Sequence, residues 1–233
     1  MGDTIGVNLF YGEDPLRQVA NGLMPPPKDD GVFVVYAHGS SNNVQYYDEN
    51  GGRHWTATRD AFSTVMGWHS KEWQTAMKSG KNITVVLLSC NTGSNNYVDH
   101  NSQKRIVTPI NIAQRISTFP NVTVIAPDGY CYYGGDKNGK PAILGVLNEK
   151  GNGGFRTFKN GKGGPKSFNP YKENGTGKKA DGNTGPSREN NGLSREQNDA
   201  TVATGSGDVK ISSIDGSGGS GSGSSSGSTS TGK

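Results

Sequence analysis

Three continuous apolar runs stand out along the chain. They are GVFVVYA at 31–37, NITVVLL at 82–88 and NVTVIA at 121–126. Each is short and rich in β-branched or aromatic residues, which is the pattern of a strand covered on both faces of a parallel sheet. The runs therefore predict three buried, parallel β-strands.

Amphipathic segments separate these runs. Residues 70–80 have a serine cap, an acidic residue in the first turn and a glycine at the end, and residues 108–117 begin with Thr-Pro and carry apolar residues at helical spacing. An alternation of strands and helices gives right-handed crossovers, with helices lying on the faces of the sheet. We expect an α/β fold, a three-layer α-β-α sandwich with a mostly parallel sheet.

Two further strand signals flank this central pattern. VNLFY at 7–11 predicts an added edge strand, and YCYYGGDKNGKPAILGVL at 130–147 predicts a hairpin whose turn carries Asn138-Gly139. Both would extend the sheet domain without adding to its parallel centre.

Composition divides the chain into three regions. The apolar runs lie between residues 5 and 158, where we place one domain. Residues 159–205 are rich in Gly, Asn, Lys and Pro, and residues 206–233 are mostly Gly and Ser. Such segments bury too little apolar surface to offset the entropy of ordering, so we expect a basic extension in loops or disorder and then a flexible tail.

The charge pattern and the absence of apolar spans limit the partners. The net charge of +4 comes largely from residues 159–179, where six lysines face one glutamate. No aromatic-basic motif of a nucleic-acid module accompanies them, so we do not expect nucleic acid as a partner.

No segment resembles a signal peptide or reaches membrane-spanning length. This favours a chain that has no membrane span and is either cytoplasmic or exported without a standard leader. The sequence leaves the oligomeric state open.

Candidate chemistry follows two of the predicted strands. His38 ends the first apolar run, and Cys90 follows the second. Carboxyl ends of parallel strands share one edge of a sheet, where ligands of open α/β folds bind. A thiol becomes a nucleophile beside a basic group such as imidazole, and the backbone amides of Gly39 and Cys90 are candidates to stabilise an oxyanion. Asp60 or Asp99 could orient the imidazole, and a third member is left unassigned.

The segments YAHGSS at 36–41 and VVLLSCNTG at 85–93 resemble the two signature segments of caspase-like cysteine peptidases. That clan (clan CD) includes caspases, metacaspases, legumains, gingipains, clostripain and CHAT domains, and similar segments occur in bacterial polymorphic toxins and in self-cleaving toxin domains. The resemblance covers about residues 31–135, and the spacing from His38 to Cys90 is similar to the roughly fifty residues seen in caspases. It implies a caspase-like fold, a Cys90 nucleophile, a His38 partner, and an oxyanion held by the Gly39 and Cys90 amides.

The function that the resemblance implies is that of a cysteine endopeptidase with a His-Cys dyad, acting in self-processing or as a bacterial effector or toxin module. Its substrate is a polypeptide, and the chemistry needs no metal or organic cofactor. In this clan, the segment after the following strand helps to line the specificity pocket. Asp128 or Asp136 in that segment would favour a basic side chain, although Pro-Asp-Gly is also an ordinary turn sequence.

Two alternatives stay open. The first is a caspase-like interaction module with an idle dyad. The second is an α/β-hydrolase, in which the oxyanion segment is also an apolar strand followed by His-Gly. The nucleophile elbow of that fold does not match, because it needs small residues at the positions that Leu88 and Thr92 occupy.

Overall fold

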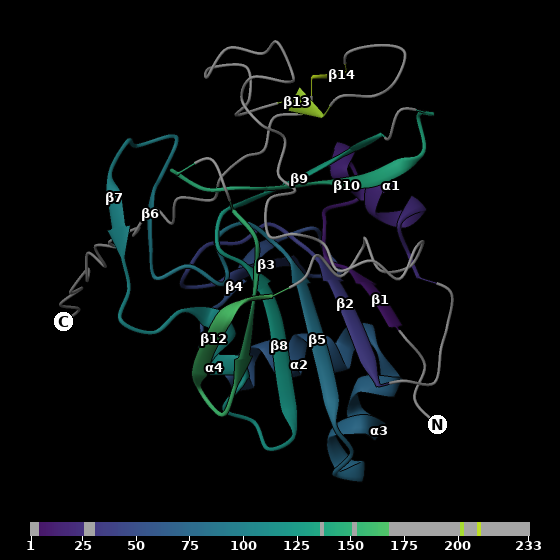
Figure 1. Cartoon of the computed structure of the whole chain (residues 1–233). Coiled ribbons are helices and arrows are strands. Elements are labelled where there is room, and N and C mark those ends of the chain that lie inside the picture. Colours follow the sequence, from purple (N-terminus) through teal and green to yellow (C-terminus); the bar gives the residue numbers. More distant parts are fainter. Residues whose placement is uncertain are drawn as a thin grey trace, which may run out of the picture.

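A six-stranded, mostly parallel sheet forms the centre of the protein (Figure 1). The computed structural model describes residues 5–25, 31–135, 138–150 and 153–167, together with residues 201–202 and 209–210. The strand order is β1-β2-β5-β8-β11-β12, in which β1, β2, β5 and β8 are parallel and β11 and β12 are antiparallel. These strands are β1 (Ile5–Asn8), β2 (Val32–Tyr36), β5 (Ile83–Leu88), β8 (Val122–Pro127), β11 (Phe155–Lys159) and β12 (Lys162–Ser167).

Four helices and four two-stranded ribbons surround this sheet within the described residues. The helices are α1 (Pro15–Gly22), α2 (Arg59–His69), α3 (Lys71–Ser79) and α4 (Ile112–Ile116). The ribbons are β3 (Val44–Tyr47) with β4 (Arg53–Thr56), β6 (Asn96–Val98) with β7 (Arg105–Val107), β9 (Tyr130–Gly135) with β10 (Pro141–Leu147), and β13 (Thr201–Val202) with β14 (Val209–Lys210). The predicted mixed α/β fold with a mostly parallel sheet is confirmed, and more of it is strand than helix.

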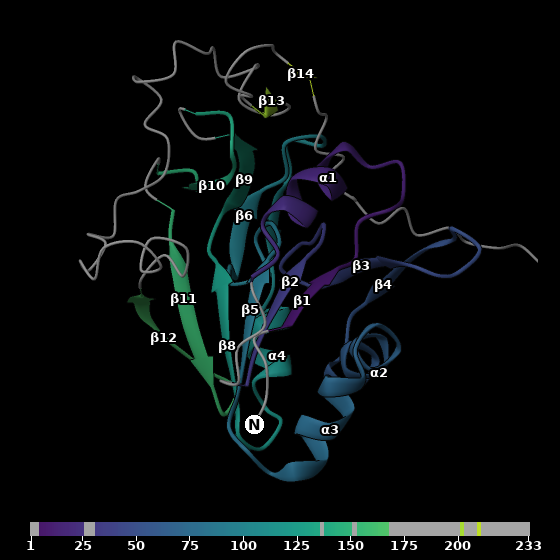
Figure 2. The same cartoon turned by 90° about the vertical axis from the view of Figure 1, so that its right-hand side faces the viewer.

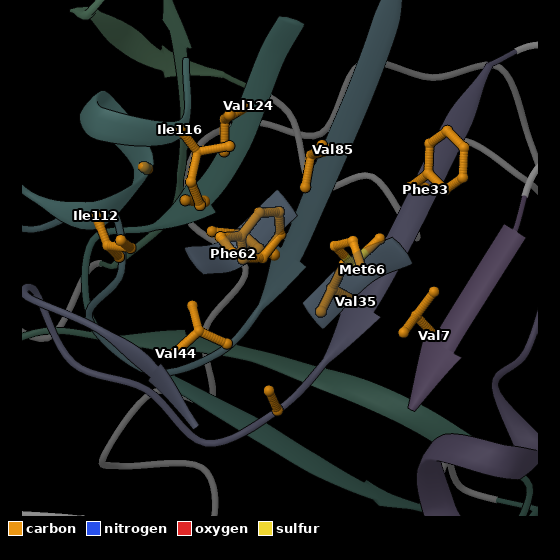
Figure 3. Close-up of a cluster of buried hydrophobic side chains, with 14 of the residues drawn as sticks. Val7, Phe33, Val35, Val44, Phe62, Met66, Val85, Ile112, Ile116 and Val124 are labelled. Carbon is orange, nitrogen blue, oxygen red and sulfur yellow. The ribbon is translucent and has the colours of Figure 1, made fainter. Parts of the chain in front are cut away.

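The larger core lies between the sheet and helices α2, α3 and α4. Alternate residues of the strands point toward these helices because successive side chains of a strand face opposite sides. Figure 3 shows strand residues facing helix residues in this core. The labelled strand residues are Val7, Phe33, Val35, Val44, Val85 and Val124, and the labelled helix residues are Phe62, Met66, Ile112 and Ile116. All of them are at most 3 % exposed, so this layer excludes water.

The opposite face of the sheet is covered differently from the expected layer of helices. A second core joins strand residues such as Tyr36 and Leu88 to Leu16 of α1 and to Tyr133 and Val146 of the β9–β10 hairpin. Figure 2 shows α2 and α3 on one side of the sheet, with the hairpin and α1 near the end of the sheet at which β2, β5 and β8 finish. This layer is therefore part helix and part hairpin.

Local signals explain where the helices begin. Asp14 caps α1 ahead of Pro15, Thr58 caps α2, and Ser70 caps α3 by accepting the Trp73 N–H. The helix predicted over 108–117 is shorter than expected and begins at Ile112, because Asn111 and Gln114 form a reciprocal capping box.

The predicted hairpin is present as β9–β10, and an edge strand is present as β1, which lies at Ile5–Asn8 rather than at the predicted residues 7–11. The sheet continues through β12 to Ser167, past residue 158, where the sequence places the end of the domain. Most of the predicted basic extension and almost all of the glycine-serine tail lie outside the described residues. None of the four described helices has the length and hydrophobicity that a bilayer crossing requires.

Candidate functional site

His38 and Cys90 occupy matching positions on two adjacent strands. β2 and β5 are parallel neighbours, and the last pair in their register joins Tyr36 to Leu88. Each site residue follows its strand by two positions. Since neighbouring strands lie about 4.8 Å apart, the two backbones leave the sheet side by side at its carboxyl edge.

Both side chains lie on the same face of the sheet. Tyr36 and Leu88 belong to the core beneath α1 and the β9–β10 hairpin, and Cys90 packs against that core. The His38 ring meets the edge of Phe10, a member of the same core, with ring centroids 4.9 Å apart. The imidazole and the thiol are therefore both directed toward the layer of α1 and the hairpin.

A carboxylate holds the imidazole. Nε2 of His38 lies 2.7 Å from Oδ2 of Asp14, and the two side chains are only 11 % and 14 % exposed. Oδ1 of the same carboxylate accepts the Leu16 backbone N–H at 2.8 Å. An ionised carboxylate only accepts hydrogen bonds, so this contact assigns the ring proton of a neutral His38 to Nε2 and leaves Nδ1 as the nitrogen that can act on another group.

Asp14 was not among the residues that the sequence pointed to. Its signal was the dipeptide Asp-Pro ahead of a helix, which predicts a cap but not a histidine partner. The two aspartates offered instead are engaged elsewhere. Asp60 is exposed on α2, 3.4 Å from Arg59, and Asp99 accepts from the Ser102 hydroxyl in the loop between β6 and β7.

The backbone after Cys90 turns sharply and is anchored to the next strand. Asn91 has a left-handed φ of 57°, and its N–H donates to the Gly129 carbonyl at 2.8 Å. The Gly93 N–H donates to the Pro127 carbonyl at 2.8 Å. These bonds fix the half-buried Cys90 at the end of β5 and leave its neighbouring backbone in one defined conformation.

The second cysteine lies in the hairpin above the first. Sγ of Cys90 is 3.9 Å from the Cys131 carbonyl oxygen, a weak contact for a thiol donor. Cys131 itself is buried, and burial, with a smaller contribution from Cys90, raises the pKa of its thiol well above the ordinary value. Cys131 is therefore the less reactive thiol of the pair.

Gly39 lies where a side chain would not fit. Gly39 and Val44 form an isolated antiparallel β-bridge. The two hydrogen bonds of this bridge are made by the flanking residues: the Gln45 N–H donates to the His38 carbonyl, and the Ser40 N–H donates to the Asn43 carbonyl. In such a non-hydrogen-bonded pair, the Gly39 amide itself points away from the partner strand. A Cβ at this position would meet Ser89 Oγ at 2.2 Å.

The two predicted specificity residues have different outcomes. Asp128 exchanges two hydrogen bonds with Gly154: Oδ1 accepts the Gly154 N–H at 2.7 Å, and the Asp128 N–H donates to the Gly154 carbonyl at 2.9 Å. These bonds tie the segment after β8 to the residue before β11, and they test neither the specificity role nor the local turn. Asp136 lies outside the described residues.

No group of three or more His, Cys, Asp or Glu side chains is placed to hold a metal ion in the part of the chain that the structure describes.

Comparison with known proteins gives one match. No curated protein and no solved structure matches the chain. A family model described as a domain of unknown function, DUF8616, matches residues 5–143, a span that contains Asp14, His38 and Cys90. Because this match covers more than half of the sequence, the chain belongs to that family.

Proposed function

We propose that the protein is a caspase-like cysteine endopeptidase in which Cys90 is the nucleophile and His38 is its acid-base partner. The observation that supports this is the placement of both side chains at matching positions of adjacent parallel strands, on one face of the sheet and at its carboxyl edge. Ligands of open α/β sheets bind at this edge.

In the first half of the proposed reaction, the Cys90 thiol gives its proton to the His38 imidazole. The thiolate attacks the carbonyl carbon of a peptide bond, and the carbonyl oxygen takes the electron pair. The Gly39 and Cys90 backbone amides stabilise this oxyanion. The C–N bond then breaks, the imidazolium protonates the leaving amine, and a thioester to Cys90 remains.

In the second half, His38 takes a proton from a water molecule, which attacks the thioester. The carbon–sulfur bond breaks, a carboxylic acid leaves, and the proton on His38 returns to the Cys90 sulfur. This cycle uses a polypeptide and water only, and the thiol is regenerated. The resemblance to toxin-borne domains extends the proposal to self-processing or to a bacterial effector role.

The direct test is cleavage by the full chain and by single-site variants. Wild-type protein is incubated with a mixed peptide library and by itself, and new termini are identified by mass spectrometry. Cys90→Ala and His38→Ala should each abolish cleavage while thermal unfolding remains cooperative. Cys131→Ala, which removes the other thiol, is the control and should retain cleavage. Unchanged cleavage in the Cys90 and His38 variants would reject the assignment.

Thiol alkylation provides a test that needs no substrate. Iodoacetamide should modify Cys90 at or below neutral pH and should modify Cys131 far more slowly in the folded protein, since Cys131 is buried with a raised pKa. Modification of Cys90 only at alkaline pH would indicate an ordinary thiol. That result, together with no cleavage by the wild type, would favour a caspase-like interaction module with an idle dyad.

A further inference from the structure

We infer that Asp14 is a positioning residue of this site, which fixes the His38 ring so that Nδ1 is the atom that takes the Cys90 proton. The inference rests on the proposed function for its consequence in catalysis. The orientation of the His38 ring and its tautomer follow from the contacts of Asp14 and His38 and do not depend on the proposed function.

The carboxylate is bound at both oxygens. Oδ2 lies 2.7 Å from His38 Nε2, and Oδ1 accepts the Leu16 N–H at 2.8 Å in the first turn of α1. The Asp14 backbone is held as well, because its N–H donates to the Tyr11 carbonyl at 3.0 Å and its carbonyl accepts the Arg17 N–H at 2.9 Å. The carboxylate therefore cannot rotate away from the ring without breaking the cap of the helix.

The ring and the backbone that carries it are both held. Phe10 packs against the ring at a steep angle with ring centroids 4.9 Å apart, and the His38 backbone carbonyl accepts the Gln45 N–H at 2.9 Å. Both partners of the carboxylate–imidazole pair are largely shielded from water, so solvent screens their interaction weakly. One ring orientation and one tautomer are thus selected before any substrate binds.

This arrangement has a chemical consequence. With the proton held on Nε2 by a group that only accepts, the lone pair of Nδ1 is available to a thiol on the neighbouring strand. When Nδ1 takes that proton, the positive charge of the imidazolium is compensated by the carboxylate. In Ser-His-Asp hydrolases, replacing the orienting Asp by Asn reverses the tautomer and lowers kcat about 10⁴-fold.

The substitution Asp14→Asn separates this role from capping. Asparagine caps helices as well as aspartate does, so its Oδ1 still accepts the Leu16 N–H and α1 remains in place. Its NH₂ group then donates to Nε2 of His38, which forces the ring proton onto Nδ1. We expect Asp14→Asn to unfold with the wild-type midpoint, and its ¹⁵N imidazole spectrum should show the proton moved from Nε2 to Nδ1.

Two readouts connect the tautomer to the thiol. The rate of Cys90 alkylation at neutral pH should fall by roughly an order of magnitude or more in Asp14→Asn, because a protonated Nδ1 cannot accept the thiol proton. Peptide cleavage should lose about 10²- to 10⁴-fold in kcat with little change in KM. Asp60→Asn, which alters an exposed carboxylate on α2, is the matched control and should leave both rates unchanged.

A second variant keeps the test decisive. Asp14→Ser retains a capping oxygen but has neither a carboxylate nor an amide for the ring, so its alkylation rate should lie between those of wild type and Asp14→Asn. Wild-type ¹⁵N shifts and alkylation rates in both variants would overturn the role of Asp14. If the wild type cleaves no peptide but the tautomer and alkylation rate shift as expected, the peptidase proposal fails and the role of Asp14 stands.

Discussion

Asn91, the residue after the proposed nucleophile, combines two unfavourable features. Its φ of 57° is left-handed, and its side chain is 1 % exposed, with no hydrogen-bond partner for either amide atom among the residues that the structure describes. A left-handed φ costs most residues with a Cβ about 1–2 kcal/mol, and asparagine less, whereas a buried unpaired polar group costs about 1–3 kcal/mol. Residues with such unfavourable features are concentrated at functional sites, where the surrounding structure holds the backbone in a required conformation.

Replacing Asn91 by glycine should stabilise the protein by up to about 1 kcal/mol, measured by urea unfolding, because it removes the unpaired amide at a left-handed position that glycine adopts freely. The larger unfolded-state entropy of glycine offsets part of this gain. The control is Asn121→Gly. Asn121 has a similar φ of 61°, but its amide donates to the Gly80 carbonyl at 2.8 Å, so that substitution also removes a hydrogen bond. A smaller gain at Asn121 is expected. Loss of stability in Asn91→Gly would show that the buried amide is satisfied in solution.

The helix caps show how element boundaries are set by single side chains. Ser70 precedes α3, where its hydroxyl accepts the Trp73 N–H at 3.2 Å and donates to Oε2 of Glu72 at 2.9 Å. A hydrogen bond from its own backbone amide, and then the one from Ser70, lowers the pKa of Glu72. The cap and the carboxylate therefore act together.

Ser70→Ala should cost about 1 kcal/mol at neutral pH, measured by urea unfolding. A carboxylate whose pKa is lower in the folded state adds stability above its unfolded pKa and loses it as the pH falls through the folded one. The cost of Ser70→Ala should therefore shrink below about pH 4. Thr58→Ala removes the cap of α2, which has no carboxylate partner among the described contacts, and its cost should stay constant with pH. Equal pH dependence in the two variants would contradict this account.

The elements that could be predicted from the sequence are those with a strong local signal. β2, β5 and β8 follow from continuous apolar runs rich in β-branched residues, and the β9–β10 hairpin follows from Asn138-Gly139 between two apolar segments. α2 was missed although it has a threonine cap and apolar residues at helical spacing, because Thr64, Val65 and Gly67 are weak helix formers. Strands of three or four residues, as in β3–β4 and β6–β7, carry too short a pattern to recognise.

The site was predictable only in part for a similar reason. The chain order of strands placed His38 and Cys90 at one edge, since parallel strands end together. Asp14 reaches His38 only because α1 packs on the sheet beside β1, which is a tertiary arrangement. No local pattern distinguishes an aspartate that caps a helix from one that also binds a histidine.

At the scale of the whole molecule, the structural unit extends beyond the family match. The match ends at residue 143, whereas β11 pairs with β8 and places Phe155 in one core and Phe158 in the other. β11 therefore closes both layers of the fold, although the residues around it are rich in glycine and lysine.

Phe158→Ala should lower the free energy of unfolding by about 3–5 kcal/mol, as expected for a fully buried aromatic side chain, which is here 1 % exposed. Val107→Ala, at an apolar side chain that is 68 % exposed, is the control and should change stability by about 0.5 kcal/mol or less. Denaturant titration of both variants measures these changes in the free energy of unfolding. A small effect at Phe158 would mean that β11 does not belong to the cooperative unit.

The burial of Cys131 gives the chain an internal reporter of its own opening. Its sulfur should meet a reagent only when the β9–β10 hairpin lifts from the sheet, whereas Cys90 is only half-buried in the closed protein. The slow modification of Cys131 in native buffer therefore measures the free energy of that local separation without any added label. Comparing it with global unfolding would show whether the hairpin detaches alone or only when the entire domain loses its structure.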